Sequence, residues 1–221
     1  LYFAMQKRNY SQLLTERTRR ILIPLIFGVL AIAPLHFIIF QKFYNLPMSY
    51  YPHAGHLWFL GNIFIYVLIL APLFFYLKKK EEGKFRKGLS FLMKNPLTPL
   101  ALSIFFVLEA LIVNPQIYSV YAETWHGLFL GLLAFFFGFL FVYTGQVFWQ
   151  TVSKWKWLYM GLAVVLYVIR LMVFETTSPN YLMAIESNCW IFGVFGLGYQ
   201  YLNKPSMVLS YLSQAAYPVY I

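Results

Sequence analysis

The sequence predicts an all-α fold, a polytopic bundle of helices that spans a membrane. Its 221 residues are 61% hydrophobic and only 11% charged, with a mean hydropathy of +0.64. A soluble domain averages about 45–50% apolar and about 25% charged residues, so this apolar excess is too large for a single core in water. Two further observations agree: apolar stretches near 20 residues recur, and basic loops alternate with uncharged ones. The one cysteine, Cys189, excludes a disulfide scaffold and a cysteine-rich zinc site, and we expect no metal.

Six full spans are expected, with a partial one at each end of the chain, because about 20 apolar residues cross a bilayer. The full spans cover residues 21–40, 57–77, 97–114, 125–149, 157–176 and 183–202. Residues 1–5 resemble the last turn of an earlier span, and a seventh apolar segment runs from Ser206 to Ile221. We therefore expect residues 1–221 to form a single membrane domain that is incomplete at both ends.

The basic residues predict the orientation of these spans. Of the 17 Lys and Arg residues, 15 lie in alternate loops, Lys42 lies in the opposite set and Arg170 lies inside a span. Cytoplasmic loops carry the excess of Lys and Arg, so the basic loops are expected to be cytoplasmic. The net charge of +10 then reflects topology and the lipid bilayer as a partner, and not binding to nucleic acid. The most basic segment, residues 78–94, is expected to be a solvated loop.

Helix-breaking and small residues inside the spans predict their packing. Pro24, Pro34 and Pro72 are expected to kink the helices that contain them. Glycines at 127 and 131, and again at 193, 196 and 198, are expected to let helices approach closely.

Polar residues inside the spans gather in one half of the membrane. Ionisable groups there cost roughly 2.5–3.5 kcal/mol each and are candidates for function. In the predicted orientation, the outer half contains Glu109, Arg170, Glu186, His36, His53, His56 and His126. The simplest account is a polar cavity that opens away from the cytoplasm. Three alternatives stay open: Arg170 and Glu186 form a structural ion pair, Glu109 is neutral and hydrogen-bonded, and each histidine is a residue of the membrane interface.

Two arginines mark the opposite surface. Arg17 and Arg20 are three residues apart at the entry to the first span, so a helix places them on one face. Two guanidinium groups one turn apart suit a phosphate or pyrophosphate at the level of the lipid headgroups. The alternative is that both only set the topology and anchor the helix to lipid.

Three segments resemble the acyltransferase-3 family of integral membrane acyltransferases. Residues 17–24 (RTRRILIP) resemble the family's R-x-x-R-[LI]-x-x-P at the entry of its third helix. Residues 55–60 (GHLWFL), with Tyr66, resemble its H-L-W-F-L…Y segment, and residues 211–221 (YLSQAAYPVYI) resemble its late S-x-x-x-Y-P-[VI]-Y segment. Residues 135–139 also resemble the family's F-F-x-x-G-[FY] helix. These motifs are most similar to those of the glucans biosynthesis protein C branch, whose members succinylate periplasmic glucans.

The resemblance implies a bacterial inner-membrane enzyme of about ten helices. Such an enzyme moves an acyl group, acetyl or succinyl, from cytoplasmic acyl-CoA to a hydroxyl of an extracytoplasmic glycan, with no permanently bound cofactor. Arg17 and Arg20 would bind the donor, and His56 with Trp58 would face the outer pocket. The family's main catalytic histidine belongs to its first helix, in an R-x10-H motif outside these residues. We accordingly expect this segment alone to be inactive.

The implied chemistry is acyl transfer from a thioester to an alcohol. His56 is the candidate general base, while the acceptor pocket is assigned to Trp58, Arg170, Glu186, Glu109 and His126. A transporter or flippase of a glycan or lipid-linked substrate is the rival function, because kinked helices and charges at membrane depth suit it too. A non-catalytic membrane scaffold is the third alternative.

Overall fold

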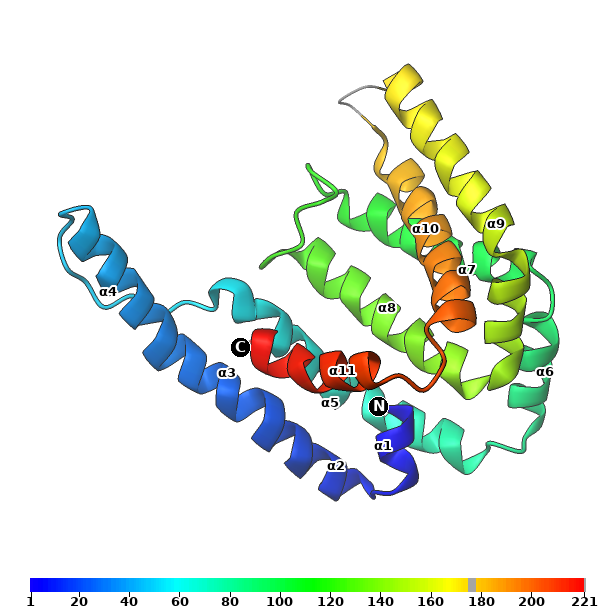
Figure 1. The fold of residues 1–221 in the computed structure, drawn as a ribbon, viewed down its shortest axis with the longest axis horizontal. Coiled ribbons are helices and arrows are strands. Elements are labelled where there is room, and N and C mark those ends of the chain that lie inside the picture. Colours follow the sequence, from blue (N-terminus) through cyan, green and yellow to red (C-terminus); the bar gives the residue numbers. More distant parts are fainter. Residues whose placement is uncertain (175–177, 221) are drawn as a thin grey trace. The chain divides into compact units, whose positions relative to one another are not determined.

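The computed structural model describes residues 1–174 and 178–220, and within these ranges every regular element is a helix (Figure 1). The α-helices are α1 (Tyr2–Gln6), α2 (Tyr10–Arg17), α3 (Ile23–Phe27), α4 (Ala33–Phe43), α5 (Trp58–Lys79), α6 (Lys84–Leu92), α7 (Leu97–Val113), α8 (Trp125–Tyr143), α9 (Gln146–Ile169), α10 (Asn180–Tyr201) and α11 (Met207–Tyr220). Short π turns are η1 (Thr18–Leu22), η2 (Gly28–Ile32) and η4 (Arg170–Phe174), and η3 (Gly55–Leu57) is a 3-10 turn. The all-α fold class is confirmed.

The chain divides into two compact units. One contains residues 3–75 and 210–221, and thus α2 to α4 and most of α5. The other contains residues 76–209, with α6 to α10. The expectation of a single membrane domain over residues 1–221 stays a prediction.

The first span is a continuous helical segment from Tyr10 to Phe43, longer at both ends than expected. A π turn precedes each of its two prolines, η1 before Pro24 and η2 before Pro34. Proline has no N–H, and its ring clashes with the carbonyl four residues earlier. The wider turn, in which the Ala33 N–H bonds back to the Gly28 carbonyl, carries the helix past that clash. Pro72, by contrast, lies inside α5 without interrupting it.

The first unit has its core where this helix meets the start of α5. Ile21, Leu57 and Leu60 are buried there. Gly28 faces Leu57 so closely that a Cβ at this position would overlap the leucine side chain. The small residue therefore sets the distance between η2 and the segment that leads into α5.

Within the residues that the structure describes, four helical segments are long and apolar enough to cross a membrane, whereas the sequence predicted six full spans. They are residues 10–43, 55–79, 125–143 and 146–174. The pair α6 and α7, bent by 101° at the break between them, makes a fifth if counted as one span. α10 covers the expected sixth span and has the length, but Asn180, Glu186 and Asn188 lower its hydropathy. Of the expected segments 157–176 and 206–221, residues 175, 176 and 221 lie outside the described ranges.

The expected boundary at Trp149 is wrong. α8 ends at Tyr143, and α9 begins at Gln146, so Trp149 lies in the first turns of α9. Gly145 makes the turn with a φ of 71°, a left-handed conformation that glycine adopts without a steric penalty. An apolar run that continues through a glycine turn cannot be divided by hydropathy alone.

The basic segment 78–94 is not the solvated loop that we expected, because α6 occupies half of it. Arg86 of α6 donates from Nε to the Tyr143 carbonyl oxygen at 2.8 Å and pairs through Nη1 with Glu81 at 3.1 Å. Tyr143 in turn donates its hydroxyl to the Leu77 carbonyl oxygen at 3.1 Å. These bonds satisfy carbonyl groups at the C-terminal ends of α8 and α5, which have no partner within their own helix.

In the second unit, α10 packs against both α7 and α9 (Figure 1). Glycines permit the close approach to α9: a Cβ on Gly196 would overlap the Val152 carbonyl oxygen, and one on Gly193 would overlap Met160. Gly198 has open space in the Cβ direction, so the packing role expected for it is wrong. α10 thereby brings its polar residues into the middle of the unit.

Candidate functional site

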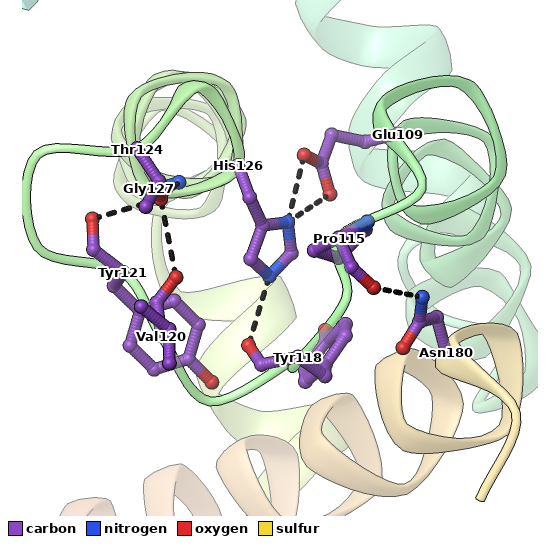
Figure 2. Close-up of polar contacts among 9 residues, drawn as sticks. All are labelled: Glu109, Pro115, Tyr118, Val120, Tyr121, Thr124, His126, Gly127 and Asn180. Carbon is purple, nitrogen blue, oxygen red and sulfur yellow. Dashed lines mark hydrogen bonds and ion pairs between the residues drawn. The ribbon is translucent and has the colours of Figure 1, made fainter. Parts of the chain in front are cut away.

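A buried polar contact in the second unit joins Glu109 of α7 to His126 of α8. His126 Nδ1 lies 2.9 Å from Oε1 and 3.1 Å from Oε2 of Glu109, while its Nε2 lies 3.0 Å from the Tyr118 carbonyl oxygen (Figure 2). The two side chains are only 4% and 1% exposed. The structure therefore places two predicted acceptor-pocket residues in direct contact.

The chemistry of these contacts fixes how the imidazole is protonated. A carbonyl oxygen can only accept, so His126 Nε2 carries a hydrogen and donates it to Tyr118. One further proton lies between Nδ1 and the Glu109 carboxyl, and it leaves the pair neutral overall on whichever side it resides. Both ring nitrogens are occupied, so His126 in this arrangement holds the structure together and has no lone pair available for a substrate proton.

The pair holds the connection between α7 and α8, residues 114–124, against the unit. Asn180 at the start of α10 donates to the Pro115 carbonyl oxygen at 2.8 Å (Figure 2). At the other end, the Thr124 hydroxyl caps α8 by accepting the Gly127 N–H at 3.0 Å. A Cβ on Gly127 would overlap the Tyr121 backbone, so the expected close approach at this glycine is to the connection itself.

Tyr118 links this connection to α10. Its ring is 4% exposed and packs with Ala110 of α7 and Ala184 of α10, and its hydroxyl is hydrogen-bonded to Ser187. Burial, with smaller contributions from Tyr121 and Glu109, raises the pKa of this phenol above its usual value, and the bond to Ser187 opposes that rise. Tyr118 is consequently a neutral hydroxyl at physiological pH.

The neighbouring residue of α10, Glu186, forms a second ion pair. Arg170 donates from Nε to Oε2 at 2.7 Å and from Nη2 to Oε1 at 3.3 Å. The arginine is 21% exposed and the glutamate 8%. Arg170 opens the π turn η4, and such turns recur at functional sites. The structure shows the Arg170–Glu186 ion pair that the sequence left open, and the role of the pair toward a substrate stays a prediction.

The other predicted site residues belong to the first unit. His56 is exposed on the 3-10 turn η3, and Trp58, half-buried, is the first residue of α5. Their catalytic and acceptor-pocket roles stay predictions. The four residues of the two ion pairs lie in the second unit, and their roles toward an acceptor stay predictions as well.

The two predicted donor-binding arginines differ in their surroundings. Arg20 is exposed and pairs with Glu16 at 3.2 Å, and the same carboxyl pairs with Arg8 at 2.9 Å. Arg17 is half-buried, and its Nε has no hydrogen-bond partner although the atom is buried. A buried N–H of this kind is normally satisfied, so Arg17 is the better placed of the two to receive an anion.

No group of three or more His, Cys, Asp or Glu side chains suited to a metal ion occurs in the ranges that the structure describes. Sequence reasoning found the members of both ion pairs but missed Tyr118, whose backbone carbonyl and side chain connect them. The Thr124 cap was visible in principle, since threonine directly before an apolar helical run is a strong N-terminal signal. Nothing in the sequence marks the Tyr118 carbonyl.

Comparison with known proteins yields one finding. The model of the acyltransferase-3 family, described as an acyltransferase domain, matches residues 2–221. Neither the curated proteins nor the solved structures give a match. The match covers almost the whole chain and agrees with its all-helical, apolar fold. The chain therefore belongs to the acyltransferase-3 family and is a membrane acyltransferase domain.

Proposed function

We propose that this protein is an O-acyltransferase that moves an acetyl or succinyl group from acyl-CoA to a hydroxyl of an extracytoplasmic carbohydrate. Membership of the acyltransferase-3 family over residues 2–221 carries the proposal. The distribution of Lys and Arg supports an orientation with the basic loops in the cytoplasm of the bacterial inner membrane. The resemblance to the glucans biosynthesis branch favours a glucan as the acceptor.

In the proposed reaction, a general base takes the proton of the sugar hydroxyl, and the oxygen attacks the thioester carbonyl. The carbon–sulfur bond then breaks, an ester forms, and CoA leaves as a thiolate that is protonated to the thiol. His56 is the proposed base within these residues, because it is exposed at the start of α5. His126 is unsuited to that role, since both of its ring nitrogens are engaged.

Arg17 and Arg20 are proposed to bind the phosphate groups of the donor. The buried and unpartnered Nε of Arg17 supports this, because a phosphate oxygen would accept its hydrogen. Arg20 is exposed and shares the Glu16 carboxylate with Arg8. We therefore expect Arg17 to contribute more than Arg20 to the binding of the donor.

The test uses membranes that contain the full-length protein, labelled acyl-CoA and a neutral gluco-oligosaccharide. We expect label on the glycan in an alkali-labile ester. The Arg17→Ala, Arg20→Ala double variant should raise the KM for acyl-CoA roughly tenfold or more, since each charge-assisted bond contributes about 1.5–3 kcal/mol. His56→Ala should abolish transfer.

Arg19→Ala is the matched control, because Arg19 is exposed between the two arginines and should leave the KM unchanged. Glycan that accumulates in vesicles without being acylated would support a transporter and overturn the proposal. An unchanged KM in the double variant would return Arg17 and Arg20 to a topological role.

A further inference from the structure

A loop in the first unit folds back along α4 and is fastened to it. Gln41 of α4 donates from Nε2 to the Ser49 hydroxyl at 2.8 Å and accepts the Ser49 N–H at 2.9 Å. Further along, the Tyr50 hydroxyl donates to the Leu30 carbonyl oxygen at 2.7 Å. Pro34 lacks the N–H that would bond to this carbonyl in a regular helix. The helix thus offers the loop an acceptor at Leu30.

Between this loop and α4 lies a cavity of about 270 Å³, lined by His36, Phe37, Phe40 and His53. Its aromatic wall is continuous. Phe37 and Phe40 stack with their ring centroids 6.3 Å apart and their planes within 11°. Tyr51, which does not line the cavity, lies beside this wall: its ring is tilted by 48° to Phe37 at 5.5 Å and stacks on His53 at 5.3 Å.

The polar groups of the cavity are two imidazoles. His53 Nδ1 lies 3.3 Å from the Tyr51 carbonyl oxygen, and because a carbonyl only accepts, this nitrogen carries the hydrogen. In the neutral ring, Nε2 then presents a lone pair. His36 is exposed on the α4 side of the cavity. No Lys, Arg, Asp or Glu is among the four lining residues, so the lining favours a neutral ligand.

These features limit the classes of ligand that the cavity can bind. Anions lack a cationic partner among the lining residues, and two histidines fall short of the three protein ligands that a zinc site uses. A purely apolar chain would leave both imidazoles without partners. A sugar ring suits the site, because it has an apolar face for the aromatic wall and hydroxyl groups for the histidines. The volume lies just below the range of about 300–1,000 Å³ typical for drug-sized ligands, which suits a single sugar unit.

We propose that this cavity binds one neutral sugar residue of the acceptor glycan. The inference rests on the proposed function and adds an acceptor subsite to it. His53 and His56 are three residues apart, so their Cα atoms are separated by at most about 11 Å. A glycan held at the cavity by one sugar can therefore present a neighbouring sugar to His56.

The experiment measures the KM for a neutral gluco-oligosaccharide and the KM for acyl-CoA in membranes with the full-length protein. Phe40→Ala and His53→Ala are each expected to raise the acceptor KM roughly two- to twelvefold, which corresponds to a loss of about 0.5–1.5 kcal/mol. The KM for acyl-CoA should stay unchanged, which also shows that the variants fold. Phe40→Tyr retains the ring and should restore the acceptor KM.

Phe43→Ala is the matched control, since Phe43 is exposed on the same helix and does not line the cavity. A direct measurement, saturation-transfer NMR of the oligosaccharide with purified protein in detergent and no acyl-CoA, should show contact in the wild type and in Phe43→Ala, and weaker contact in Phe40→Ala.

The outcomes separate the two proposals. If the wild type acylates the glycan and both variants keep the wild-type acceptor KM, the subsite is overturned while the proposed function stands. If the oligosaccharide binds at the cavity but is never acylated, the proposed function fails and the subsite stands. Displacement of the oligosaccharide signal by a neutral alkyl chain alone would show a lipid site and overturn the sugar assignment.

Discussion

At the scale of single residues, the sequence identified the polar side chains that matter but not their partners. Glu109 and His126 stand out because ionisable groups are rare inside apolar spans. Their contact depends on how α7 and α8 pack, and the residues between them, 17 positions apart in sequence, carry no pattern that indicates it. The exception is Arg170 with Glu186, where a short connection between antiparallel helices already suggested the pair.

The Glu109–His126 pair is expected to stabilise the fold more than any surface ion pair. Glu109→Ala should lower the free energy of unfolding by about 3–5 kcal/mol, because it leaves a buried imidazole without its partner. The double variant Glu109→Leu, His126→Leu should lower the free energy of unfolding by less than the sum of the losses in Glu109→Leu and His126→Leu alone. Thermal unfolding in detergent provides the measurement, with Glu82→Ala, at an exposed position, as the control. Additive effects in the double variant would show that the two side chains do not interact.

At the scale of elements, hydropathy predicted where most helices lie, while backbone chemistry decided their ends and irregularities. Hydropathy could not place the boundary between α8 and α9, because the turn between them depends on the backbone conformation of Gly145 and not on a change in composition. The π turns before Pro24 and Pro34 follow from the missing N–H of proline, yet Pro72 shows that a proline alone does not predict one. Helix α6 escaped prediction because its many basic residues resemble those of a solvated loop.

The contact between α10 and α9 gives a test at this scale. Gly196→Ala is expected to destabilise the protein by roughly 1–3 kcal/mol, because the new methyl group overlaps the Val152 carbonyl and the helices must separate. Gly198→Ala, two residues along the same helix with open space around it, should be neutral or slightly stabilising. Unfolding temperatures of the two variants in the same detergent make the comparison. An equal gain of stability in both variants would show that helix propensity, and not packing, governs this helix.

At the scale of the whole molecule, the fold class was predictable because it depends on sums over many residues. The apolar excess and the placement of 15 basic residues in alternate loops predict the same fold class even if the boundary of one helix is misplaced. The site was less predictable, since it depends on single contacts such as the Tyr118 carbonyl. Family membership came from short local patterns spread over nearly the whole chain, which the match over residues 2–221 confirms.

The orientation predicted from the basic residues can be tested with single-cysteine reporters. In a Cys189→Ser background, Ala122→Cys in the connection between α7 and α8 should react with a membrane-impermeant maleimide in spheroplasts. Lys87→Cys on α6 should react only after the membrane is opened, because the positive-inside rule places α6 in the cytoplasm. Both positions are exposed, so access to the thiol depends on the side of the membrane. The reverse labelling pattern would invert the topology.

The Tyr50 hydroxyl bonds to the Leu30 carbonyl, which receives no N–H from Pro34. The conformation of the loop therefore depends on an irregularity in the helix. A variant designed to regularise the helix, such as Pro34→Ala, restores a backbone N–H that competes with Tyr50 for the same carbonyl. The helix would then gain a regular hydrogen bond, while the loop would be held less firmly. We therefore expect Pro34 and Tyr50 to be coupled, so that Pro34→Ala weakens the bond from Tyr50 to the Leu30 carbonyl.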